Sequence, residues 1–287
     1  MKKYLYDITL TDDTAPAKIL RLIEPNKAVL EIGCASGTQT QILKEQFGCT
    51  VTGIELDPDA AETARKYCDR LIVGNIEHLS LKEHLPRAQY DIIMFADVLE
   101  HLYDPGKVLN NIKEALSDDG YILASIPNVV HESIIFEILN GRFDYQKYGL
   151  LDNTHIRFFT RKTIYQLFEQ AGFVISYIDR VICSDCDTEF NKINRTEKDR
   201  KILDYVRERN PDSETFQFIV KAYKAREGAR GVYSELIAAQ EKISDLQKSM
   251  KEKDSKIGTL ESNMKWMENR LPYSFIKKLR GVFGNTR

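Results

Sequence analysis

Short apolar runs alternate with longer amphipathic segments from the N-terminus to Lys224. Apolar runs bounded by turn residues are typical of parallel strands buried on both faces, and the amphipathic segments between them are long enough for crossover helices. The pattern predicts seven strands, at 28–32, 50–55, 71–74, 91–95, 121–126, 173–181 and 216–223. It predicts helices at 14–23, 38–47, 57–68, 105–116, 132–139, 160–171 and 196–209, with a turn at 118–120. The expected fold is therefore α/β, a doubly wound and mostly parallel sheet of seven strands.

The hydrophobic pattern changes after Lys224 to a seven-residue repeat. One series of apolar residues consists of Leu236, Ile243, Met250, Ile257, Met264 and Leu271, and a second of Ala239, Leu246, Leu260 and Met267, with Lys253 at the same spacing. Such heptads predict a long C-terminal helix that forms a coiled coil over 225–271. Five heptads span about 50 Å, too long for a helix packed on its own domain. Self-association into a homo-oligomer through 236–271 is therefore the preferred interpretation.

Pro272 ends the coil and begins a basic amphipathic tail over 272–287. Within 273–283, one helical face carries Phe275, Ile276, Leu279, Val282 and Phe283, and basic residues lie beside it. This pattern is consistent with peripheral contact with an anionic membrane surface, and equally with docking on the coil.

Composition and net charge argue against several classes of protein, among them nucleic-acid-binding and disulfide-rich proteins. A net charge of −2 over 287 residues gives no overall attraction to nucleic acid. The five cysteines are scattered and odd in number, so they do not suggest a disulfide framework. No signal peptide and no apolar run long enough to span a membrane is found. We therefore expect a cytoplasmic protein, with the tail allowing peripheral association at the inner membrane face.

Candidate chemistry gathers where the predicted strands end. Gly33 and Gly37 lie in a turn between the first strand and the following helix, where the backbone can approach a ligand closely. Glu55 ends the second strand, at the distance after Gly33 where an acceptor for a ribose diol is expected. Asn75, Ala96 and Asp97 follow later strands. Ligands in parallel sheets bind at these carboxyl ends.

The segment Glu31-Ile-Gly33-Cys-Ala35-Ser-Gly37 resembles motif I of class I S-adenosylmethionine-dependent methyltransferases. Three further stretches, 53–58, 74–77 and 91–105, resemble that family in order and spacing, and the resemblance covers about residues 4–224. It implies a Rossmann-like methyltransferase domain over 1–224 with S-adenosylmethionine as cofactor. The implied cofactor-binding residues are Glu31, Gly33, Ala35, Gly37, Glu55, Leu56, Asn75, Ile76 and Ala96. Two positions depart from the family pattern: Ala35 replaces a glycine, and Asn75 replaces an aspartate.

Residues 129–157 interrupt the alternation of strands and helices. Their place after the fifth strand predicts an insertion that covers the substrate, with simple packing as the alternative. The stretch 153–160 resembles the small-molecule and glycan branch of the family. It contains His155.

Methyl transfer to a hydroxyl oxygen requires alignment and a base. The candidate catalytic residues are His101, His155 and Asp97. The two histidines are candidates by position and because histidine titrates near neutrality, and Asp97 follows the end of a strand. Asp97-x-x-Glu100-His101 also resembles a divalent-ion cluster of some quinone-pathway O-methyltransferases. We assign no metal from sequence. Glu100 is interpreted as structural.

The resulting hypothesis is an S-adenosylmethionine-dependent methyltransferase that O-methylates a sugar or glycan in bacterial surface polysaccharide synthesis. Quinone-type or other small-molecule O-methylation is the alternative. A non-catalytic coiled-coil scaffold is a competing class. A nicotinamide dehydrogenase fits the sequence less well. In the dehydrogenase pattern the third glycine follows the first by five residues, whereas Gly37 follows Gly33 by four.

Overall fold

The computed structural model describes residues 8–183, 188, 190 and 196–226, and in the C-terminal part residues 235, 239, 242, 246, 250, 253–263 and 265. The chain divides into two compact units, Met1–Gly231 and Val232–Arg287.

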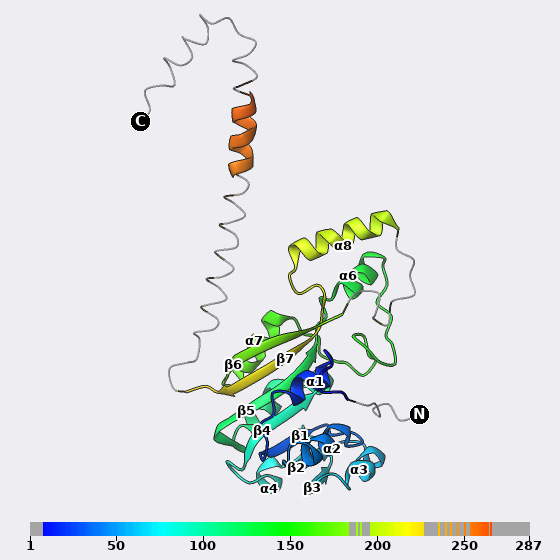
Figure 1. Ribbon diagram of the computed structural model, residues 1–287, viewed down its shortest axis with the longest axis vertical. Coiled ribbons are helices and arrows are strands. Elements are labelled where there is room, and N and C mark those ends of the chain that lie inside the picture. The colour runs from blue at the N-terminus through cyan, green and yellow to red at the C-terminus, as the bar shows by residue number, and fades with distance from the viewer. Residues whose placement is uncertain are drawn as a thin grey trace, which may run out of the picture. The chain divides into compact units, whose positions relative to one another are not determined.

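The first unit is built on one seven-stranded sheet (Figure 1). Its strands are β1 (Ala28–Ile32), β2 (Thr50–Glu55), β3 (Arg70–Val73), β4 (Tyr90–Ala96), β5 (Leu116–Pro127), β6 (Phe173–Ile182) and β7 (Thr215–Lys224), in the spatial order β3-β2-β1-β4-β5-β7-β6. The five strands from β3 to β5 pair in parallel, whereas β7 is antiparallel to both β5 and β6. The predicted mostly parallel, Rossmann-like sheet is confirmed.

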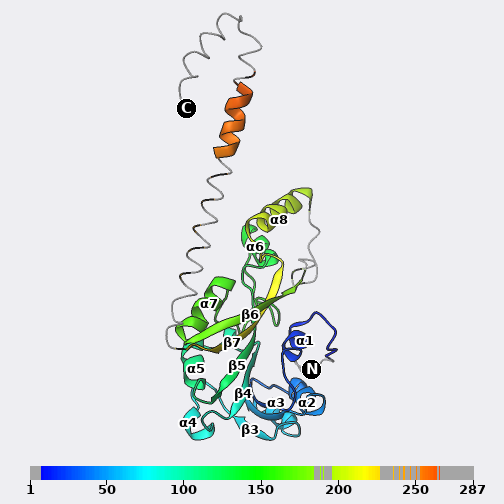
Figure 2. The ribbon, with the colours of Figure 1, turned by 60° about the vertical axis from the view of Figure 1, so that its left-hand side comes forward.

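Helices cover both faces of this sheet. The described helices of this unit are α1 (Ala15–Leu20), α2 (Thr38–Glu45), α3 (Pro58–Ala64), α4 (Leu81–His84), the 3-10 helix η1 (Leu99–His101), α5 (Pro105–Ile112), α6 (Glu132–Leu139), α7 (Arg161–Gln170) and α8 (Glu197–Arg209). Of these, α6 and α8 pack on each other beyond the end of the sheet (Figures 1 and 2). Figure 2 shows α5 and α7 on one flank and α1 and α2 on the other. Neighbouring strand residues supply the two apolar layers alternately: Val29 and Ile92 pack toward α1, whereas Leu30 and Ile93 pack toward α5 and α7. Both faces are therefore buried, which explains the uninterrupted apolar runs.

The strand predictions agree with the structure to within a few residues except at one place. The turn predicted at 118–120 is wrong: these residues belong to β5, which begins at Leu116. The pairing of β5 with β4 shifts register between Tyr90 and Ile92, so the chain passes an irregularity without leaving the sheet. A Cβ at Gly120 would lie 2.9 Å from the Asp91 carbonyl oxygen, and this close approach favours glycine. The short helices α4 and η1 were not predicted.

The segment after β5 is joined by ion pairs to elements much later in the chain. Arg207 of α8 binds the fully buried Glu132 of α6 through two hydrogen bonds of 2.7 and 2.6 Å. Arg161 at the start of α7 binds Asp212 in the same bidentate way. Both views place α6 beside α8 (Figures 1 and 2). A charge paired in this geometry tolerates burial. The Glu132–Arg207 pair holds the first residue of α6 against α8, and the Arg161–Asp212 pair holds the start of α7 near the start of β7.

Residues 253–263 of the second unit form a continuous and exposed helix. Four predicted heptad residues, Leu246, Met250, Ile257 and Leu260, expose more than half of their surface. Most of the predicted coil, and the whole tail over 272–287, lie outside the described residues. Among the described helices, none is both long and apolar enough to cross a bilayer.

Candidate functional site

The candidate site lies at the carboxyl ends of β1, β2 and β4. β1 is the strand at which the strand order of the sheet reverses, since β2 lies on one side of it and β4 on the other. Ile32 is in register with Ile54 of β2 and Phe95 of β4, so the residues that follow these strands meet. Such a reversal point is where open α/β sheets bind ligands.

A glycine turn connects β1 to α2 in left-handed backbone conformations. The φ angles of Gly33, Ala35 and Gly37 are 73°, 47° and 83°. A Cβ at Gly33 would lie 2.7 Å from Val98, and one at Gly37 would lie 2.9 Å from the Ala64 backbone. These two positions therefore require glycine. Ala35 adopts its conformation at a cost of about 1–2 kcal/mol, which the surrounding contacts must offset.

Glu55 supplies the contact that holds this turn. Its Oε2 accepts a hydrogen bond of 2.7 Å from the Ala35 N–H, and its Oε1 accepts one of 2.8 Å from the Asp57 N–H. Each carboxylate oxygen has a second lone pair, so Glu55 can also accept from a ligand diol. The predicted ribose acceptor is thus positioned by the glycine turn itself.

Glu31 is a buried acid directly beneath the turn. Thr40 Oγ1 of α2 donates a hydrogen bond of 2.5 Å to its Oε2. Burial raises the pKa of the Glu31 carboxyl to about 8, although the Thr40 hydrogen bond acts in the opposite direction and nearby Cys68 and Glu55 add to the rise. The carboxyl therefore titrates near neutral pH in the protein without ligand.

The remaining predicted cofactor residues lie along the same edge. The Gly74 N–H donates to the Glu55 carbonyl, which brings the end of β3 to the end of β2. Asn75 Oδ1 accepts from the Glu77 N–H at 2.8 Å, while Ile76 is buried beside it. Leu56 is 64% exposed at the end of β2. Ala96 ends β4 in register with Ser125.

Asp97 is held in a strained conformation by two later strands. Its φ is 55°, in the left-handed region. Its Oδ1 accepts hydrogen bonds from Ser125 Oγ of β5 at 2.6 Å and from Gln217 Nε2 of β7 at 2.7 Å. Burial of the carboxyl among these strands raises the Asp97 pKa, although the residue as a whole keeps an exposed face. Sequence reasoning missed Ser125 and Gln217, because no local motif marks them.

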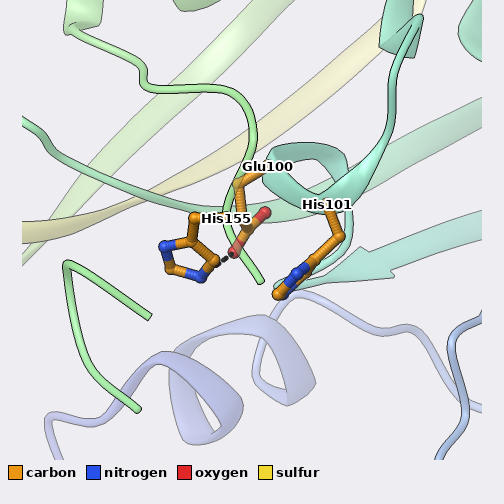
Figure 3. A group of neighbouring side chains, drawn as sticks. All are labelled: Glu100, His101 and His155. Atoms are coloured by element: carbon orange, nitrogen blue, oxygen red, sulfur yellow. Dashed lines mark ion pairs between the residues drawn. The ribbon is translucent and has the colours of Figure 1, made fainter. Parts of the chain in front are cut away.

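Glu100, His101 and His155 form a compact group, called here the Glu-His-His cluster (Figure 3). One candidate ligand atom from each residue lies within 4.8 Å of the others. His155 Nε2 lies 3.9 Å from Glu100 Oε1, and the two imidazole rings meet edge to face with centroids 4.7 Å apart. His101 Nδ1 lies 3.1 Å from the Thr154 carbonyl and His155 Nδ1 lies 3.1 Å from the Leu150 carbonyl. The structure thus brings the two predicted catalytic histidines together.

Glu100 is 1% exposed, and neither carboxylate oxygen has a hydrogen-bond partner among the described residues. Burial, followed by the neighbouring Asp97 charge, raises the Glu100 pKa well above its ordinary value. An orphaned buried carboxyl is costly unless a proton or a cation compensates it. The structure places Glu100, interpreted from the sequence as structural, beside His155.

Backbone hydrogen bonds hold the segment that carries His155 beside Glu100. The N–H groups of Ile156 and Arg157 both donate to the Glu100 carbonyl at 3.0 Å, and Arg157 Nε donates to the Tyr103 carbonyl at 3.1 Å. These contacts join η1 to a segment that follows it only after α5, β5 and α6. The cluster therefore depends on the path of the segment after β5.

Comparison with known proteins matches residues 10–177 to the family described as Methyltransferase domain. That match covers more than half of the chain. The chain belongs to this methyltransferase family. The predicted methyltransferase domain, and S-adenosylmethionine as the cofactor of this family, are confirmed at the level of the family.

Curated relatives of the methyltransferase include two proteins named ubiquinone biosynthesis O-methyltransferase. The one from Hydrogenovibrio crunogenus is 26% identical over 52% of this chain and 63% of its own length. The one from Aeromonas salmonicida is 22% identical over 63% of this chain and 76% of its own length. The methyltransferase thus spans less than two thirds of the first relative and about three quarters of the second.

Solved structures show the same fold. An S-adenosylmethionine-dependent methyltransferase from Archaeoglobus fulgidus has a TM-score of 0.51 at 21% identity and covers 73% of this chain and 92% of its own. One from Mesorhizobium loti has a TM-score of 0.50 at 16% identity and covers 75% of this chain and 99% of its own.

The buried Glu31 predicts a distinctive pH dependence of folding. Because its pKa is raised in the folded state, its contribution to stability is fully present below the ordinary pKa of 4.5 and is lost as pH rises to about 8. Glu31→Gln carries no charge at any pH, so this variant should gain stability relative to the parent across that window. Urea denaturation without ligand at several pH values measures the difference. A constant difference would contradict the assignment.

Glu55 should contribute to the binding free energy of the cofactor. We expect Glu55→Ala to weaken S-adenosylhomocysteine binding by about 2–3 kcal/mol, since hydrogen bonds to charged groups are strong. Glu55→Gln, which keeps one carbonyl acceptor, should lose less. Calorimetry measures both, and the matched control is Glu62→Gln on the exposed surface of α3. Unchanged affinity in Glu55→Ala would reject the ribose assignment.

Proposed function

We propose that the methyltransferase transfers a methyl group from S-adenosylmethionine to a hydroxyl oxygen of a small aromatic acceptor, of the phenol or quinol class. The names of the curated relatives support O-methylation of such an acceptor over the sugar or glycan favoured from sequence alone. The sugar alternative is kept as a competing acceptor in the experiment below.

The observation that carries this proposal is the Glu-His-His cluster following the end of β4. Displacement at a sulfonium carbon needs an aligned acceptor oxygen, and a hydroxyl becomes a good nucleophile when its proton is removed. We assign this deprotonation to the two histidines, with His101, the more accessible one, facing the acceptor. Asp97, held by Ser125 and Gln217, would position the acceptor or the methyl donor.

The cofactor would bind at the edge formed by β1 to β4. Glu31, Gly33, Ala35 and Gly37 would surround its amino-acid portion, Glu55 would accept from the ribose, and Leu56, Asn75, Ile76 and Ala96 would contact the adenine and its surroundings. The geometry of the turn supports this arrangement, because the Glu55 carboxylate binds the Ala35 N–H and α2 begins directly after Gly37.

Residues 129–157 would cover the acceptor. Exposed aromatic side chains gather on this segment and next to it: Phe143 makes edge-to-face contacts with Tyr145 and Phe158, with ring centroids 5.7 and 6.0 Å apart. All three are at least 36% exposed, as is Tyr148. Aromatic faces of this kind suit a flat apolar ring, and their surface is available for contact.

The proposed reaction is tested with the full chain and radiolabelled S-adenosylmethionine. Label should pass to catechols or hydroquinones more readily than to sugars. His101→Gln should lower kcat by about 10²- to 10⁴-fold, the usual size of general-base loss, while S-adenosylhomocysteine affinity stays unchanged. His78→Gln, on the exposed turn after β3, is the matched control.

Preferential labelling of sugars would restore the glycan hypothesis. Absence of labelled product with any acceptor, together with intact cofactor binding, would favour the scaffold. Full activity in His101→Gln would remove His101 from the mechanism.

We also propose that the heptad helix joins copies of the chain into a homo-oligomer. The exposed Leu246, Met250, Ile257 and Leu260 repeat with coiled-coil spacing, and a second copy of the same helix offers the matching apolar surface. The peripheral membrane contact predicted for 273–283 stays a prediction.

Charges at the apolar heptad positions should separate the copies. Leu246→Asp with Ile257→Asp should yield monomers that keep methyl transfer to a small acceptor. Ser255→Asp with Ser262→Asp adds the same charge outside the apolar heptad positions, so this variant should remain oligomeric. Sedimentation measures both pairs. A parent chain that sediments as a monomer would overturn the proposal.

A further inference from the structure

We propose that Cys34 and Cys68 form a dithiol that peroxide converts reversibly into a disulfide, and that this disulfide weakens cofactor binding. Cys34 belongs to the glycine turn between β1 and α2, and Cys68 lies between α3 and β3. Disulfide formation rests only on the placement of the two thiols. Its effect on the cofactor rests on the proposed function, which puts the cofactor at this turn.

Gly53 of β2 marks the place where the two sulfur atoms meet. A Cβ on this glycine would lie 2.8 Å from Cys34 Sγ and 2.9 Å from Cys68 Sγ. Both sulfur atoms therefore border the space that a side chain at this position would fill, and the two thiols hydrogen-bond to each other. A glycine inside a strand often marks such a close approach. The cysteines are far apart in the sequence, so the fold itself creates the pair.

The two thiols differ in exposure and in acidity. Cys34 is 3% exposed, whereas Cys68 keeps part of its surface accessible. The hydrogen bond with Cys34 lowers the pKa of the Cys68 thiol, burial acts in the opposite direction, and the charge of Lys44 adds to the decrease. The same hydrogen bond, together with burial, raises the pKa of the Cys34 thiol. Cys68 is therefore the thiol that ionises and attacks, and Cys34 is the resolving thiol.

The oxidation consists of two displacements. The Cys68 thiolate attacks one oxygen of hydrogen peroxide, so an S–O bond forms, the O–O bond breaks, and hydroxide leaves and takes a proton from solvent. The Cys34 sulfur then attacks the sulfenic acid, so the S–S bond forms, the S–O bond breaks, and water leaves with the Cys34 proton. Two electrons pass from the thiols to peroxide, which becomes two molecules of water. A dithiol such as dithiothreitol reverses the change and is itself oxidised.

The disulfide would act on the glycine turn from two sides of the sequence. The Cys34 carbonyl accepts a hydrogen bond of 2.8 Å from the Gly37 N–H, so Cys34 belongs to the bonding of the turn. Tyr67, next to Cys68, packs against the same turn, since a Cβ at Gly37 would lie 2.9 Å from Tyr67 Cδ2. An S–S bond of about 2.05 Å is shorter than the contact between unbonded sulfur atoms. Its formation therefore draws Cys34 toward Cys68 and displaces the turn.

The test uses the reduced full-length protein, a brief exposure to hydrogen peroxide, and alkylation of the remaining thiols. Peptide mass spectrometry should find Cys34 linked to Cys68. Calorimetry should then show S-adenosylhomocysteine affinity lowered by roughly 5- to 150-fold, the usual range of coupling between two sites, and dithiothreitol should restore it. Cys68→Ser should bind this ligand equally well with and without peroxide. Cys183→Ser, which removes a thiol directly after β6, should respond like the parent.

Thermodynamic linkage provides a second measurement. Because the ligand binds the dithiol form more tightly, saturating S-adenosylhomocysteine should raise the reduction potential of the pair. The expected rise is about 30 mV for each tenfold difference in affinity between the two forms. Titration with mixtures of reduced and oxidised dithiothreitol measures this potential with and without the ligand.

Circular dichroism establishes that each variant is folded, and Cys34→Ser replaces Cys68→Ser if that variant is not. Absence of the linked peptide, unchanged affinity in the linked protein, or an undiminished response in Cys68→Ser would each overturn the proposal. The linked peptide is detected without cofactor or acceptor, and methyl transfer is measured separately on the reduced protein. A failure of the proposed function is therefore recognised independently.

Discussion

The carboxylate of Glu55 is the contact on which the cofactor end of the molecule depends. It joins the end of β2 to the glycine turn after β1 through the Ala35 N–H, and to the start of α3 through the Asp57 N–H. The turn contains a non-glycine residue in a left-handed conformation, so this hydrogen bond offsets local strain as well as aligning two strands. The same atoms that would bind a ribose therefore also shape the site.

Three buried acids near the strand ends illustrate different ways of placing a carboxyl in a protein interior. Glu55 accepts from backbone N–H groups, and Glu31 shares a short hydrogen bond with Thr40 while its pKa rises to about 8. Glu100 has neither kind of partner among the described residues, although it is the least exposed of the three. Glu100 is therefore the acid of the three whose burial is compensated by no hydrogen bond among the described residues.

The strands were predictable because β1, β2 and β4 are mostly apolar and buried on both faces, and a turn residue or an acid lies at or directly after the end of each run. The cofactor edge was predictable for the same reason, since the motif residues lie within a few positions of each strand end. The Glu-His-His cluster was predictable only in part. His155 reaches Glu100 through backbone contacts between segments far apart in the sequence, and Ser125 and Gln217 meet Asp97 from separate strands. Local patterns carry no information about such distant pairings.

The attachment of the segment after β5 has a consequence for how related enzymes diverge. Its beginning is fixed by the Glu132–Arg207 pair, and its end by the Glu100 carbonyl. Between these anchors, residues 141–149 run between two glycines in left-handed conformations, and a Cβ at Gly141 would meet no atom within 4 Å. The Gln146 N–H donates to the Leu151 carbonyl, and the Asn153 N–H donates to the Gln146 carbonyl. The part before Gln146 is therefore where length or aromatic content can change with least effect on the segment that carries His155. Under the proposed function, the range of acceptors would change there while the histidines keep their positions.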